Sequence, residues 1–181
     1  MSTATVIVIV LAVLAVAAAA WVIMQREKTR KLKNAFGPEY DRAIDQEKNP
    51  RRAEALLEER QKRVAKYHIR PLTQEERETF AAKWRKTQEH FVDDPRDAVA
   101  QADALITEAM STRGYPMSDF DQRAADLSVD HPVVCENYRL AHDIAMRNSE
   151  GSASTEELRK AMQHYRNLFE HVLDTRVLQY H

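Results

Sequence analysis

Nineteen consecutive apolar residues, from Val6 to Met24, lie near the start of this 181-residue chain. At a rise of 1.5 Å per residue, a helix of that length covers about 30 Å, which is the thickness of the hydrocarbon layer of a bilayer. Trp21 lies near the end of the run, where an aromatic side chain at the membrane interface is expected. The sequence therefore predicts a transmembrane helix that contacts the lipid bilayer through residues 6–24.

A cluster of cations follows this apolar run and contains a single anion, Glu27. The cations are Arg26, Lys28, Arg30, Lys31 and Lys33. Cations beside a span stay on the cytoplasmic side, so we expect the chain from Gln25 onward in the cytoplasm and a very short N-terminal tail outside. Together with Trp21 these cations form the predicted membrane interface. Two roles are open for them: contact with anionic lipid headgroups, or only a stop-transfer flank.

The apolar run has a second interpretation, a cleaved signal peptide. The small residues from Ala15 to Ala20 offer cleavage sites, and the mature chain would then be a periplasmic or secreted helical protein. Against cleavage, residues 1–5 contain no Lys or Arg, and the cations follow the run instead of preceding it. We favour an uncleaved anchor over residues 1–33, followed by a soluble helical domain over residues 34–181.

Several function classes are excluded by composition. The chain has three glycines, none near another, so the glycine-rich loops of dinucleotide-binding, P-loop and kinase folds are absent and no cofactor is expected. Its single cysteine excludes an internal disulfide and multi-cysteine metal sites. The net charge is −1, and the cationic flank carries +4, which leaves −5 for residues 34–181. We therefore expect no nucleic-acid partner.

Helix-start signals recur along residues 34–181. Prolines follow Gly37, Asn49, Asp94 and His131, and capping patterns begin at Thr73, Asp94, Ser118 and Ser154. The apolar residues between these signals repeat with a helical period. The predicted helices are 38–47, 50–68, 73–92, 95–112, 118–127, 132–148 and 155–178. We predict an all-α fold, in which a single N-terminal transmembrane helix precedes a compact multi-helix bundle.

The segment 73–92 shows how side chains are expected to divide between core and solvent. Phe80, Trp84, Phe91 and Val92 form an apolar stripe that we expect to face the core. The many carboxylates, such as Glu54, are expected in first turns or opposite the stripes, where they are solvated. No catalytic pair of carboxylates is recognisable among them.

His131 and Cys135 form the sharpest local candidate for chemistry. If Pro132 opens a helix, the two residues lie on its first turn, where the helix dipole and an imidazolium would lower the thiol pKa. The alternative is that His131 or Asp130 caps the helix and Cys135 is a small, inert core residue. Buried inert cysteine is the commoner case, so we expect neither a catalytic nor a metal site here.

Three stretches of sequence resemble a family of uncharacterised bacterial proteins with one N-terminal hydrophobic segment and a helical remainder. They are Phe36–Arg42 (FGPEYDR), Phe91–Pro95 (FVDDP) and Arg123–Pro132 (RAADLSVDHP). The resemblance implies a membrane-associated or exported protein but supplies no activity or catalytic residue. In the first stretch, Gly37 and Pro38 break the long helix, either to fold Tyr40 back onto the bundle or as an ordinary helix start.

The expected function is a binding or scaffolding module at the membrane surface, which acts on an unknown protein partner or by self-association. The exported helical protein described above is the alternative. An enzyme with a site assembled between helices comes third, because no catalytic motif is recognisable.

Overall fold

The computed structural model describes residues 3–173, with side chains from residue 11 onward. Within residues 3–173 the chain forms eight helices and no strand, which confirms the all-α prediction. The helices are α1 (Thr3–Phe36), α2 (Pro38–Glu47), α3 (Pro50–Val64), α4 (Gln74–His90), α5 (Pro95–Arg113), α6 (Phe120–Asp130), α7 (Pro132–Ser149) and α8 (Thr155–Leu173). Residues 174–178 of the last predicted helix lie outside the described residues.

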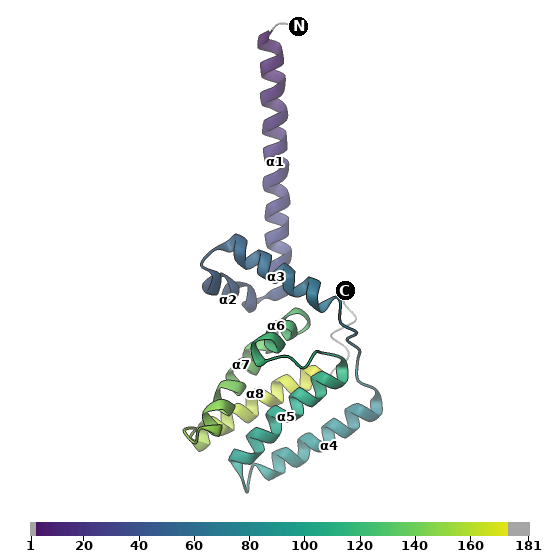
Figure 1. Cartoon of the computed structure of the whole chain (residues 1–181), viewed down its shortest axis with the longest axis vertical. Helices are drawn as coiled ribbons and strands as arrows, with labels where there is room; N and C mark the ends of the chain where they lie inside the picture. Colours follow the sequence, from purple (N-terminus) through teal and green to yellow (C-terminus); the bar gives the residue numbers. More distant parts are fainter. Residues whose placement is uncertain (1–2, 174–181) are drawn as a thin grey trace.

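Helix α1 rises away from the rest of the molecule as one unbroken rod (Figure 1). It stops at Gly37, whose φ of +48° is available to glycine at little cost, and Pro38 begins α2 in a new direction. The predicted boundary at residue 33 falls inside α1. Leu32 and Phe36 are buried, so the last turns of α1 belong to the domain.

Most helix starts agree with their sequence signals. The Asn49 side chain accepts from two backbone amides of α3, and that of Asp94 does the same in α5. Thr73 and Glu76 form a complete capping box. The predicted start at Ser118 is wrong by one residue, because the carboxylate of Asp119 caps α6 instead. A carboxylate adds a favourable interaction with the helix dipole at that position.

Helix α3 ends at Val64, four residues before the predicted end at residue 68. Residues 65–73 then form a non-helical connection to α4. Hydrogen bonds to distant residues hold this connection in place of the backbone hydrogen bonds of a helix. The Tyr67 hydroxyl donates to Asp126 Oδ2 at 3.1 Å, and the Arg70 amide donates to the Arg113 carbonyl at 2.8 Å. Pro71 also disfavours helical geometry in the residue before it.

The main core is built by α4–α8. Helix α8 packs against α7 and α5, and α4 packs against α5 (Figure 1). Phe80 and Trp84 are buried as predicted, and the Trp84 ring stacks on Phe169 at a centroid distance of 5.0 Å. Val92 is an exception. Its side chain is 82% exposed, because α4 ends at His90 and Val92 lies in the turn that follows.

A second, smaller core lies where α1 meets α2 and α3. Its buried residues are Leu32, Phe36, Tyr40, Ala43, Ala53 and Leu57. Val129 of α6 packs against this cluster from the bundle side. In Figure 1, α2 and α3 lie between the base of α1 and the remaining helices. The long helix is therefore fixed in a small core of its own, which rests on the main bundle.

Candidate functional site

The exposed part of α1 is an apolar cylinder that no other part of the described chain covers. Between residues 11 and 24 every side chain is exposed, and Val16 and Met24 have exposed fractions of 69% and 68%. The first buried side chain of the helix is Leu32. Contiguous exposed apolar surface of this extent is typical of a segment that contacts a membrane or another protein.

The transmembrane prediction itself is not supported by the described residues. Among the residues whose side chains the structure describes, no helix is both long enough and apolar enough to cross a membrane. Residues 6–10, the first five of the apolar run, lie outside that part of the chain.

The base of α1 is joined to α3 by polar contacts that the sequence does not reveal. Glu54 was expected to be solvated, but it is 6% exposed and accepts two hydrogen bonds. One comes from the Thr29 hydroxyl at 2.7 Å and the other from the Tyr40 hydroxyl at 3.0 Å. Burial and this carboxylate raise the pKa of Tyr40 to about 12. Tyr40 thus folds back, as the first of the two interpretations expects, but onto α1 and α3.

A groove of about 470 Å³ lies beside α1, between its base and the start of α3. Its lining residues are Trp21, Val22, Gln25, Arg26, Thr29, Arg30, Lys33, Asn34 and Arg51. Arg26, Arg30 and Lys33 share one face of α1, because they are spaced at four and three residues. Lys33 Nζ also lies 5.2 Å from the centre of the Tyr40 ring. The groove is therefore cationic along its length and apolar at its outer end.

The predicted interface residues divide between two sides of α1. Trp21, Arg26, Arg30 and Lys33 line the groove described above. Lys28 and Lys31 line a second hollow with Glu27 and Glu58. There the Lys28 ammonium pairs with Glu58 at 2.8 Å. Arg51, which the sequence did not indicate, comes from another helix and reaches the groove only through the fold.

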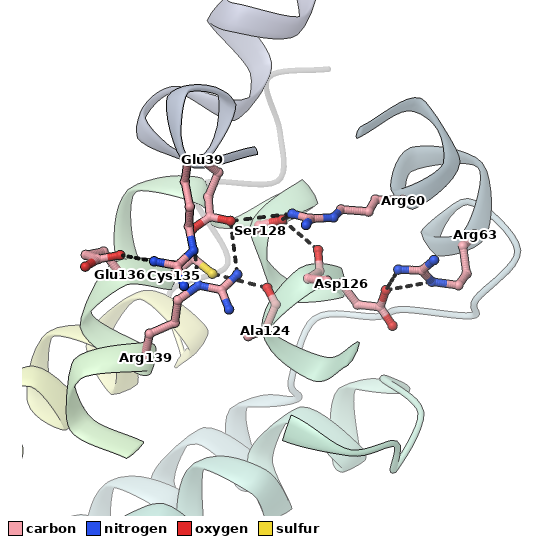
Figure 2. A network of polar contacts seen from close by, with 11 residues as sticks. Glu39, Arg60, Arg63, Ala124, Asp126, Ser128, Cys135, Glu136 and Arg139 are labelled. Atoms are coloured by element: carbon pink, nitrogen blue, oxygen red, sulfur yellow. Dashed lines mark hydrogen bonds and ion pairs between the residues drawn. The ribbon is translucent and has the colours of Figure 1, made fainter. Parts of the chain in front are cut away.

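A buried network of ion pairs joins α2 and α3 to the bundle (Figure 2). The Glu39 carboxylate, 3% exposed, pairs with Arg60 of α3 at 3.5 Å and with Arg139 of α7 at 3.0 Å. Burial lowers the pKa of Arg60, although the charge of Glu39 opposes this. Arg60 also donates to the Ser128 hydroxyl of α6 at 3.4 Å. The network thus connects four helices between the two apolar cores.

A second branch of the same network lies along α3 and α6. Arg63 donates two hydrogen bonds to Asp126 Oδ1, at 2.9 and 2.8 Å, and Asp126 is 1% exposed (Figure 2). One feature of the sequence could have indicated that a charged residue of α7 needs a buried partner. Arg139 lies four residues from the buried Cys135, at the edge of the apolar face of α7, where a cation needs a counter-charge.

The structure turns His131 and Cys135 toward different partners. The Cys135 thiol donates to the Ala124 carbonyl at 3.1 Å, and burial, followed by the charge of Glu39, raises its pKa to about 12. This direction is opposite to the lowered pKa that a reactive thiolate requires. The buried position of Cys135 fits the alternative of an inert core residue.

His131 precedes α7 but its side chain caps no amide. Its Nε2 accepts a hydrogen bond from Arg113 Nη1 at 3.0 Å, so the neutral ring carries its proton on Nδ1. Burial, then the charges of Arg113 and His171, lower the pKa of His131 to about 4. An imidazolium that could activate a thiol is therefore disfavoured at this position.

The described residues contain no group of three or more histidine, cysteine, aspartate or glutamate side chains placed to hold a metal ion. The most distinctive feature of the described surface is therefore the exposed apolar helix with its cationic base. The resemblance to uncharacterised bacterial proteins stays a prediction. No protein-family model, no curated protein and no solved structure matches this chain.

Proposed function

We propose that this chain is a membrane-anchored helical module, in which residues 6–24 of α1 cross the bilayer and α2–α8 form a binding or scaffolding domain at its surface. The observation that carries the proposal is the uncovered apolar surface of α1, which extends over every side chain from residue 11 to residue 24. A bilayer covers such a cylinder on all sides, whereas a groove in a protein partner would cover only one face.

The connection between α1 and the domain supports a role in positioning. No flexible linker separates them, because α1 continues unbroken to Phe36. The buried side chains of Leu32 and Phe36, the Glu54 hydrogen bonds and the Lys28–Glu58 pair fix the helix to α3. A domain fixed in this way keeps one orientation to the bilayer, which suits a protein that holds a partner at a defined height and angle.

The partner-binding surface that we propose is a groove between the end of α4 and the first turns of α8. The groove measures about 260 Å³, and the apolar residues among those that line it are Phe91 and Met162. Two arginines of α8 also line it, and each is paired with a glutamate of the same helix, Arg159 with Glu156 and Arg166 with Glu170. Exposed apolar side chains beside paired arginines favour a protein segment that presents apolar side chains, either from another protein or from a second copy of this chain.

Membrane extraction combined with topology reporters tests the anchoring. We expect the full chain to stay in the membrane fraction after alkaline carbonate treatment, and a C-terminal reporter that works only in the cytoplasm to be active. Replacement of Val13, Leu14 and Val16 by Asp is the variant, because each carboxylate costs about 3 kcal/mol at the centre of a span. A matched triple replacement of exposed Ala55, Ala81 and Ala104 by Asp adds the same charge to the domain and should leave the fractionation unchanged.

Two outcomes would contradict the anchoring. Release of the unmodified chain by carbonate would show that α1 is covered by something other than the bilayer. A mature N-terminus immediately after one of the residues 15–20 would show that the segment is a cleaved signal, and the exported helical protein would then be the correct interpretation.

Crosslinking in intact membranes tests the binding role. A photo-reactive residue at Gln88 or Gln163 lies in the α4–α8 groove, and one at Glu59 on exposed α3 is the control. We expect a discrete adduct from the groove positions that Arg159→Glu together with Arg166→Glu abolishes, since both side chains are exposed at the groove. Adducts that form equally from the control position would contradict a specific partner surface at this groove.

A further inference from the structure

We propose that the groove at the base of α1 is a binding site for the headgroup of an anionic phospholipid. This inference rests on the proposed membrane anchoring and makes it more specific. The groups that would contact the phosphate are the Arg26 and Arg30 side chains of α1 and the Arg51 side chain of α3. The occupant is a lipid of the bilayer that surrounds α1, and a soluble phosphate is the alternative that the experiment must exclude.

The first argument is charge. Arg26, Arg30 and Arg51 form no ion pair with a carboxylate of the described residues. Three unneutralised guanidinium groups around one groove repel one another and attract an anion. The opposite side of α1 is different, since Lys28 there is paired with Glu58. The positive charge of the flank is thus concentrated on one side of the helix.

The second argument is depth. At 1.5 Å per residue, Arg26 lies about 3 Å and Arg30 about 9 Å beyond Met24, the last residue of the apolar run. The headgroup layer is about 5–8 Å thick on each side of the hydrocarbon. The guanidinium groups of these two residues can therefore reach the level of the lipid phosphates. Trp21 and Val22 form the outer end of the groove, at the level where acyl chains begin.

The third argument is the chemistry of the donors. A guanidinium group presents a planar fork of N–H donors that matches two phosphate oxygens. The backbone amides of Arg51 and Arg52 at the start of α3 already donate to Asn49 Oδ1, at 3.0 and 3.3 Å. The helix N-terminus is thus occupied by its own cap, and side chains from two helices would bind the anion. A site made by two helices distinguishes this proposal from a simple stop-transfer flank.

Trp21 offers a direct readout, because the chain has only two tryptophans and Trp84 is buried in the main core. The background chain for every measurement is the full chain with Trp84→Phe. This chain is placed in nanodiscs of unbrominated phosphatidylcholine. Each sample also contains one lipid that is brominated near the top of its acyl chains, either phosphatidylglycerol or phosphatidylcholine. Quenching of Trp21 gives the relative affinity of the two lipids for the groove.

We expect phosphatidylglycerol to be preferred by about fivefold or more, the contribution of about one cation near the surface. The groove variant Arg26→Gln, Arg30→Gln and Arg51→Gln should lose the preference. The control variant Lys31→Gln, Arg52→Gln and Lys62→Gln removes the same number of cations from positions that do not line the groove, and it should keep the preference. Circular dichroism checks that both variants retain the helicity of the background chain.

Three results would overturn the proposal. They are equal affinity of the two lipids for the background chain, equal loss of preference in both triple variants, and loss of the preference when millimolar sodium phosphate replaces sodium chloride at constant ionic strength. The last result would assign the groove to a soluble anion. Failure of the anchoring is distinguishable, because the chain would then be extracted by carbonate whichever lipid is present.

Discussion

The carboxylate of Glu39 lies between two guanidinium groups that come from different helices, Arg60 of α3 and Arg139 of α7. A buried group of three charges of this kind contributes little net stability when intact, because all three side chains have lost their hydration. Removal of its carboxylate is costly, because the remaining charges stay buried without a partner. Glu39 therefore acts mainly as a specificity contact, which sets how α2 rests on α3 and α7.

Replacement of Glu39 by Gln should lower the free energy of unfolding by about 3 kcal/mol, because two buried guanidinium groups lose their counter-charge. Urea titration of the full chain in detergent micelles, followed by circular dichroism, measures this value. The matched control is Asp143→Asn, which breaks the exposed pair with Arg147 and should cost less than about 1 kcal/mol. Equal losses in the two variants would contradict the role of burial.

His131 should make the stability of the domain depend on pH in a defined window. Its pKa is about 4 in the folded chain, against an ordinary value of 6.5. Between these values the unfolded chain holds more protons, so stability is complete above pH 6.5 and falls as the pH is lowered toward 4. The loss between about pH 7 and pH 4.5 should be about 2 kcal/mol from this residue.

The variant His131→Gln tests this dependence, because Gln can still accept from Arg113 but does not titrate. We expect the fall in unfolding free energy between those two pH values to be smaller by about 2 kcal/mol than in the unmodified chain. Above about pH 7.5 the two chains should change in parallel, because the histidine is neutral in both states there. Identical curves over the acidic window would refute the assignment.

At the scale of the elements, Gly114 shows how closely one segment can depend on another. It ends α5 with a φ of +98°, and a Cβ at this position would lie 2.4 Å from the His68 carbonyl oxygen. The connection from α3 to α4 therefore passes directly over the end of α5. Neither a positive φ alone nor a crowded position alone would require glycine as strictly as both together.

The substitution Gly114→Ala should destabilise the domain by at least about 2 kcal/mol, the combined effect of the backbone strain and the displaced connection. Gly151→Ala is the matched control. Its φ is also positive, at +75°, but the nearest atom to the added methyl group, Arg96 Nη1, lies at an ordinary contact distance of 3.7 Å, so only the backbone strain of about 1 kcal/mol is expected. Thermal unfolding of the three chains measures the difference, and equal shifts would contradict the contact argument.

The helices could be predicted from the sequence where local signals determine them. Asn49, Thr73 and Asp94 start helices through contacts with their own next residues, and those starts are confirmed. The end of α3 was missed because it depends on Tyr67 and Arg70 reaching partners far along the chain. Such long-range hydrogen bonds leave no periodic signal.

The candidate site could be predicted only in part, for the same reason. The cations of the flank are visible in the sequence, and so is Trp21 at the end of the apolar run. Their division into a paired side and an unpaired side depends on Glu58 and Arg51, which the fold brings back from α3. Glu54 was expected to be an ordinary surface charge, because burial of a carboxylate is decided by its partners and not by its neighbours in sequence.

At the scale of the whole molecule, truncation separates two roles of α1. One is the proposed anchoring by its outer part, and the other is the packing of its base against α2 and α3. A chain that begins at Gln25 keeps Thr29, Leu32 and Phe36, and should fold in detergent-free buffer with the thermal stability of the full domain. A chain that begins at Pro38 loses two buried apolar side chains, which contribute about 2 kcal/mol each, and leaves Glu54 buried with one partner fewer.

Circular dichroism melts and limited proteolysis compare the two truncated chains. The shorter one should unfold at a clearly lower temperature and be cut first within α2 and α3, because these helices lose the side of their core that α1 supplies. If both chains melt at the same temperature, the base of α1 is not part of the domain and the description of two cores is wrong.

The unbroken course of α1 from Thr3 to Phe36 also couples rotation at its two ends. One extra residue in the stretch between Met24 and Leu32 would turn the outer part of the helix by about 100° relative to the domain. The number of residues in this stretch therefore sets the rotation of the domain about the axis of α1. This rotation determines which side of the bundle faces a neighbouring protein that binds the outer end of α1.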